Sequence, residues 1–147
     1  MAKKASRLPQ FLALGGLGFF ILAMILLKHQ PVDDARNEPV DVLPQEQLQQ
    51  ALQAGTPVLA FFHSNTCQQC IEMISIVGEV YPRYADTVEL VDVNVYDERN
   101  AALLQQVRLQ FIPTLIFYDQ SGEANVVVGV MQDEELNQAL ADLAGGN

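Results

Sequence analysis

Hydrophobic residues are distributed unevenly along this chain, and the longest continuous run of them lies near the N-terminus. Residues 11–27 read FLALGGLGFFILAMILL and carry no charge. As a helix, this run would be about 25 Å long, at the short end of the range for crossing a bilayer. Lys3, Lys4 and Arg7 precede it, and no acid does. The positive-inside rule therefore predicts that residues 1–10 are cytoplasmic and that everything after the run lies outside the cytoplasm.

A cleaved signal peptide is the alternative to a permanent anchor, because it shares the cationic start and the apolar run. Cleavage sites have small residues in a small-x-small spacing, whereas this run is followed by Lys28, His29, Gln30 and Pro31. We therefore predict an uncleaved transmembrane anchor over residues 11–27. The protein is then a single-pass protein of the cell membrane with an extracytoplasmic C-terminal part.

Beyond the anchor, the chain divides into a linker and one domain. Residues 28–44 contain three prolines and few large apolar residues, a composition typical of a linker. Residues 45–147 are about enough for one domain with one core. Their pattern predicts, in order, a helix over 45–55, a strand over 57–63, a helix over 67–84, a strand over 87–95, a helix over 97–106, strands over 114–119 and 124–130, and a helix over 133–143. This order predicts an α/β fold in which a helical crossover joins two parallel strands and a hairpin follows.

Local signals set the ends and faces of these elements. Residues 57–63 (PVLAFFH) form a continuous apolar run, as expected for a central strand that is buried on both sides. Gly55 should stop the first helix, and Pro82 should bend or end the second. The predicted apolar stripe of the second helix consists of Ile71, Ile74, Val77 and Tyr81.

The charge that follows the anchor excludes one class of partner. The chain has 8 cations and 18 acids, and all the acids follow the apolar run. The part outside the membrane is therefore strongly acidic and repels phosphate backbones. We expect no nucleic-acid partner.

The chain has only two cysteines, Cys67 and Cys70, and they follow a buried strand at the start of a predicted helix. The free N–H groups and positive partial charge of a helix N-terminus favour a thiolate and lower the pKa of a cysteine placed there. Cys67, the first and more exposed, is the expected nucleophile. Cys70, one turn further on, is then expected to resolve the mixed disulfide.

Three other interpretations of the cysteine pair compete with redox chemistry. A structural disulfide closing so short a loop would contribute only about 2 kcal/mol. Haem attachment needs a histidine after the second cysteine, where Ile71 stands. A copper- or zinc-binding or delivery protein is the main alternative, with Cys67, Cys70 and His63 as ligands. His63 is otherwise either a cation that lowers the pKa of Cys67 or a structural residue that closes its strand.

Two further motifs carry a resemblance to a known family. Pro113 stands directly before a predicted strand, in the segment Ile112–Thr114 (IPT), and Gly129 lies at the end of the last strand. Together with FFHSNTCQQC around the cysteines, these motifs resemble the thioredoxin family over about residues 45–143. The resemblance implies a thioredoxin-like α/β fold, a mixed central sheet flanked by helices. The N-terminal transmembrane helix predicted from residues 11–27 precedes this fold.

The resemblance also implies a function for several residues. The expected activity is thiol–disulfide exchange with protein substrates outside the cytoplasm, with Cys67 and Cys70 as catalytic residues. The Ile112–Pro113 bond is expected to be cis, and Ile112, Pro113 and Thr66 are expected to contact the substrate, partly by strand addition. No cofactor or metal is required. A membrane redox partner is needed to recycle the cysteine pair.

The chain departs from the family pattern at three places. Thr66 replaces the usual tryptophan before the first cysteine, and Gln68-Gln69 replaces the common Gly-Pro. Phe61 stands where many thioredoxins carry a buried aspartate that helps to deprotonate the resolving cysteine. The proton acceptor for Cys70 is therefore unassigned. A redox-inactive docking domain with the same fold is the remaining rival to an oxidoreductase.

Overall fold

The structure is a computed structural model that describes residues 42–145. The predicted cytoplasmic segment, the anchor over residues 11–27 and nearly all of the linker lie outside the described residues. Within residues 42–145, the helices are all too short or too polar to traverse a bilayer.

The centre of the structure is a mixed sheet of four strands in the order β2-β1-β3-β4. The strands are β1 (Val58–His63), β2 (Glu89–Asn94), β3 (Thr114–Tyr118) and β4 (Ala124–Val128). β1 runs parallel to β2 and antiparallel to β3, and β3 pairs antiparallel with β4. The predicted mixed sheet, with a crossover followed by a hairpin, is therefore confirmed.

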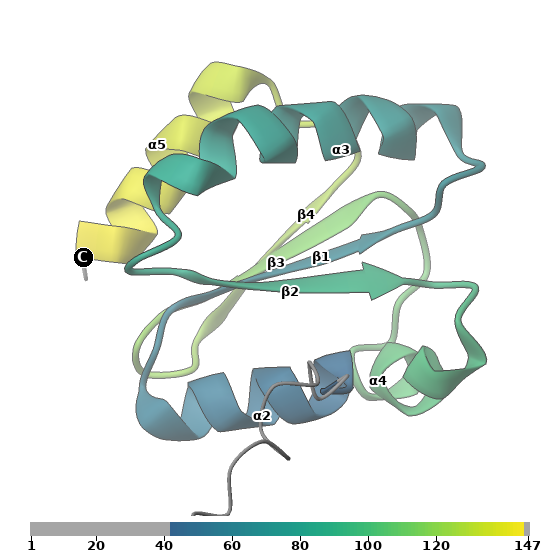
Figure 1. Cartoon of the computed structure of the whole chain (residues 1–147), viewed down its shortest axis with the longest axis horizontal. Helices are drawn as coiled ribbons and strands as arrows, with labels where there is room; N and C mark the ends of the chain where they lie inside the picture. Colours follow the sequence, from purple (N-terminus) through teal and green to yellow (C-terminus); the bar gives the residue numbers. More distant parts are fainter. Residues whose placement is uncertain (1–41, 146–147) are drawn as a thin grey trace, which may run out of the picture. The chain divides into compact units, whose positions relative to one another are not determined.

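Helices cover both faces of this sheet (Figure 1). α3 (Gln68–Val80) and α5 (Asp133–Gly145) lie on one face, and α2 (Pro44–Ala54) and α4 (Ala101–Gln106) lie on the other. Short 3-10 turns extend two of them, η1 (Tyr81–Arg83) after α3 and η2 (Glu98–Asn100) before α4.

The ends of the helices follow the local signals of the sequence. Gly55 ends α2 in the left-handed conformation (φ 68°), which costs glycine no steric strain. Pro82 lies in η1, so the α-helix predicted up to residue 84 ends at Val80. Asp97 accepts the backbone N–H of Arg99 and caps η2.

The core has two parts because β1 is buried on both sides. Leu59 and Phe61 pack with residues of α3 and α5, and Val58, Ala60 and Phe62 pack with residues of α2 and α4. The alternation along a strand sends successive side chains to opposite faces. β1 therefore holds the two layers of the protein together, and the site begins at its C-terminal end.

The predicted apolar stripe of α3 was partly wrong. The buried side chains of this helix are Cys70, Met73, Ile76, Val77 and Val80, while Ile71 is 47% exposed. The polar residues of α3 recur at helical spacing (Gln68, Glu72, Ser75 and Glu79) and mark its exposed face, and Ile71 lies beside them. Met73 and Val77 lie on the opposite face and pack against β1 and α5.

Candidate active site

The two cysteines lie at the junction between β1 and α3. Cys67 is the N-cap of α3, with extended backbone angles (φ −95°, ψ 124°). Its Sγ accepts a hydrogen bond from the backbone N–H of Cys70 at 3.4 Å. Both are free thiols, but Cys67 is partly exposed and Cys70 is completely buried. An incoming disulfide can therefore reach Cys67 first, as the sequence analysis expected.

The surroundings of the two sulfurs shift their pKa values in opposite directions. The hydrogen bond from the Cys70 side chain, followed by the one from its backbone N–H, lowers the pKa of Cys67. Burial, followed by the hydrogen bond to Cys67, raises the pKa of Cys70. A partly exposed thiol with a lowered pKa beside a buried thiol with a raised pKa is the arrangement needed to attack a disulfide and then resolve the product.

A short turn connects β1 to the first cysteine. Ser64 is fully buried, and its Oγ accepts the backbone N–H of Thr66 at 3.2 Å and lies 3.1 Å from the Thr66 hydroxyl. The Ser64 backbone N–H also contacts the Cys70 sulfur and lowers its pKa, against the larger effect of burial. Thr66 itself is exposed beside Cys67. Ser64 therefore stabilises the turn that leads to Cys67 and also contacts the sulfur of Cys70.

The Ile112–Pro113 peptide bond is cis, as the resemblance implied. Thr114 pairs with Phe62 in the β1–β3 register, so this loop lies at the same edge of the sheet as the cysteines. Pro113 is buried and Ile112 half-buried, and the carbonyl of Pro113 accepts the N–H of Gly129 at 2.8 Å. The structure thus brings the predicted substrate-binding residues to one edge. Their contact with a substrate stays a prediction.

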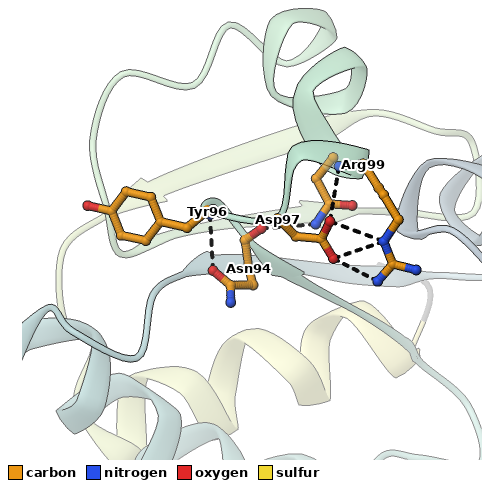
Figure 2. Close-up of polar contacts among 5 residues, drawn as sticks. Asn94, Tyr96, Asp97 and Arg99 are labelled. Atoms are coloured by element: carbon orange, nitrogen blue, oxygen red, sulfur yellow. Dashed lines mark hydrogen bonds and ion pairs between the residues drawn. The ribbon is translucent and has the colours of Figure 1, made fainter.

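A third loop, after β2, reaches the same edge because β2 runs parallel to β1. Figure 2 shows the polar contacts of this loop. Asn94 Oδ1 accepts the backbone N–H of Tyr96 at 3.0 Å, and Asp97 pairs with Arg99 at 2.7 Å. The hydrogen bonds from Arg99 lower the pKa of Asp97. The ring of Tyr96 points away from this ion pair and is 71% exposed. Tyr96 carries no sequence motif that marks it as a site residue.

His63, which ends β1, is held in a polar pair that the sequence did not reveal. Its Nε2 lies 2.7 Å from Asp92 Oδ1, and its ring stacks on Phe61 with centroids 4.6 Å apart. Asp92 is 29 residues away in sequence, and only the β1–β2 register brings it near. Among residues 42–145, no three His, Cys, Asp or Glu side chains are grouped to hold a metal ion. The three ligands of the metal interpretation therefore do not converge.

Comparison with known proteins agrees with this arrangement. Residues 44–144 match the family model of the thioredoxin-like domain. A thioredoxin of Alicyclobacillus acidocaldarius subsp. acidocaldarius is 32% identical over 95 residues, covering 65% of this chain and 89% of the relative. The thiol:disulfide interchange protein DsbD of Yersinia enterocolitica is 32% identical over 108 residues, covering 69% of this chain and 19% of that protein.

Solved structures show the same fold. The crystal structure of chloroplastic thioredoxin z superimposes with a TM-score of 0.59 at 20% identity, covering 69% of this chain and 90% of that one. The family match, the cysteine pair at the start of α3 and the cis proline agree with one another. This chain belongs to the thioredoxin family of thiol–disulfide oxidoreductases.

Proposed function

We propose that this protein exchanges disulfides with protein substrates outside the cytoplasm while residues 11–27 anchor it in the cell membrane. The observation that carries the proposal is the pairing of an accessible, low-pKa thiol at Cys67 with a buried, protonated thiol at Cys70. The relatedness to a thiol:disulfide interchange protein supports the same activity. The location rests on the cationic N-terminus and the uncharged run of the sequence.

The reaction has two balanced steps. The Cys67 thiolate attacks one sulfur of a substrate disulfide, and the other substrate sulfur leaves as a thiolate and takes up a proton. The Cys70 thiol then loses its proton and attacks the Cys67 sulfur. The Cys67–Cys70 disulfide forms, the second substrate thiol leaves, and two electrons have moved to the substrate. The same steps in reverse oxidise a substrate when the cysteine pair starts as a disulfide.

Substrate docking should use the edge formed by the three loops. Ile112, Pro113 and Thr66 are the residues that we expect an extended substrate segment to contact, with main-chain hydrogen bonds of the strand-addition type. Each turnover leaves the cysteine pair in the wrong redox state for the next one. A membrane protein that carries its own dithiol or disulfide is therefore the expected recycling partner.

The direct test is to trap the intermediate. In Cys70→Ala, the mixed disulfide on Cys67 loses the neighbouring thiol whose effective concentration normally clears it. Membranes that are quenched with acid and run on a non-reducing gel should show adducts in Cys70→Ala. Cys67→Ala is the matched control and should show almost none. If Cys70→Ala gives no more adducts than the double variant, the oxidoreductase proposal fails.

The trapping experiment with the two cysteine variants also separates the alternative functions. A metal-binding or delivery protein would lose ligation about equally with either single change, and a docking domain would form no adducts with either. No observation favours the metal function, because His63 bonds to Asp92 and the described residues include no group of three suitable ligands. The trapped adducts would also identify the substrate and the recycling partner.

A further inference from the structure

The second step of the exchange requires a base that removes the proton of the Cys70 thiol. Cys70 is fully buried and its pKa is raised by burial, so its proton has no direct way to bulk water. Phe61 occupies the interior of β1 beneath α3 and is apolar. An acceptor has to be buried on the same face of the sheet and have an unused lone pair.

His63 meets both conditions. It stands two residues after Phe61 on β1, so it faces the side of the sheet that α3 covers. Only 6% of the residue is exposed, and its Nδ1 is a buried polar atom with no hydrogen-bond partner in the structure. The next residue, Ser64, contacts the Cys70 sulfur through its backbone N–H. His63 is therefore next to the turn that supports the resolving thiol.

Asp92 determines which nitrogen of His63 is free to act as a base. The carboxylate accepts a hydrogen bond from Nε2 at 2.7 Å, and a neutral imidazole carries one proton only. With that proton on Nε2, the buried Nδ1 has a bare lone pair. The side chain of Asp92 is 59% exposed, whereas that of His63 is 8% exposed. The His63–Asp92 pair therefore connects the interior of the site to solvent.

We propose that His63 accepts the proton of the Cys70 thiol during the second step and that Asp92 is its positioning residue, an inference that rests on the proposed function. The S–H bond of Cys70 breaks, its proton moves to Nδ1 through one water, and the resulting thiolate attacks the Cys67 sulfur. The imidazolium then releases its Nε2 proton through Asp92 to solvent. In the reverse direction, His63 returns a proton to Cys70 as the disulfide opens.

Other ionisable groups do not compete for this role. The elements packed on this face carry, besides His63, the ionisable side chains of Cys67, Cys70, Glu72, Glu79, Tyr81, Arg83, Glu89, Asp92, Asp133, Glu134, Glu135 and Asp142. Arg83 is a cation that donates to Asn137. The acids of α3 and α5 are exposed. Glu89 bonds to Gln47 of α2, and the Tyr81 hydroxyl donates to Val88. β3, the other neighbour of β1, contains no Asp, Glu, His, Lys or Arg.

The two steps can be timed separately in the full-length protein with dithiodipyridine as the disulfide. Attack by Cys67 releases one coloured thiopyridone, and attack by Cys70 releases the second. In His63→Gln, the amide can still donate to Asp92, but it has no basic lone pair. We expect its first phase to match the wild type and its second phase to be roughly 10²-fold slower, the low end for loss of a general base. That second phase should then rise about tenfold per pH unit, following the Cys70 thiolate alone.

Asp92→Asn gives an independent test because this exposed side chain tolerates replacement more easily than a buried one. We expect the second phase of Asp92→Asn to slow about tenfold. His63 Nδ1 can still accept the Cys70 proton, but the imidazolium can no longer release its Nε2 proton through a carboxylate. Glu72→Gln, which removes an exposed charge from α3, is the matched control and should leave both phases unchanged.

The results distinguish this inference from the proposed function. A slowed second phase with an intact first phase supports His63 as the base. The inference is overturned if the second phase is as fast as in the wild-type protein in both His63→Gln and Asp92→Asn. It is also overturned if both phases slow equally, because that result indicates structural damage. If the wild-type protein itself shows no first phase, the proposed function fails, and this inference fails with it.

Discussion

Cys67 is the nucleophile and also the cap of its helix, so its replacement should affect stability in a way that depends on the new side chain. The Cys67 sulfur accepts the backbone N–H of Cys70 at 3.4 Å, one of the donors that the first turn of α3 leaves unpaired. Serine keeps an acceptor at this position and is a preferred N-cap residue, whereas alanine has none. We therefore expect the reduced Cys67→Ser protein to be more stable than Cys67→Ala.

The magnitude follows from the cost of losing one cap. Replacing a capping side chain by alanine costs about 1 kcal/mol, within a range of about 0.5–2 kcal/mol. For a domain of about 100 residues, each 1 kcal/mol lowers the midpoint of thermal unfolding by about 4–8 °C. Both variants lack the nucleophile, so redox chemistry does not complicate the comparison.

The assay is thermal or urea unfolding of the two variants under reducing conditions, followed by circular dichroism. Gln69→Ala, an exposed substitution in the first turn of α3, serves as a control and should change the free energy of unfolding by less than about 0.5 kcal/mol. If Cys67→Ala is as stable as Cys67→Ser, the capping hydrogen bond contributes nothing. The contribution of this N–H to the lowered Cys67 pKa, which is second to that of the Cys70 side chain, would then be wrong as well.

Three further predictions concern reactivity, packing and topology. At mildly acidic pH, an alkylating agent should modify Cys67 well before Cys70, because the lowered pKa of Cys67 gives it a larger thiolate fraction than Cys70, whose pKa is raised; mass spectrometry should show this order, and equal rates would contradict the assigned roles. Leu140→Ala should reduce the free energy of unfolding by about 2–5 kcal/mol in urea titrations, since Leu140 is fully buried in the core, whereas the exposed Ala141→Ser should have little effect. A reporter fused after Asn147 should be active outside the cytoplasm, and a cytoplasmic C-terminus would contradict the predicted orientation.

The order of helices and strands could be predicted from the sequence because it depends on local patterns. The apolar run of β1, Gly55 at the end of α2 and Pro82 at the end of α3 all act within a few residues of themselves. The position of Cys67 at the junction of a strand and a helix was visible for the same reason. The nucleophile and its chemistry were thus determined by neighbours in the chain.

The tertiary structure decided what depends on distant parts of the chain. The pairing of His63 with Asp92 depends on the register of two parallel strands joined by a long crossover. A sequence pattern gives the period of a strand but not its register against a remote partner. The proposed proton acceptor for Cys70 could therefore emerge only once the strands were side by side.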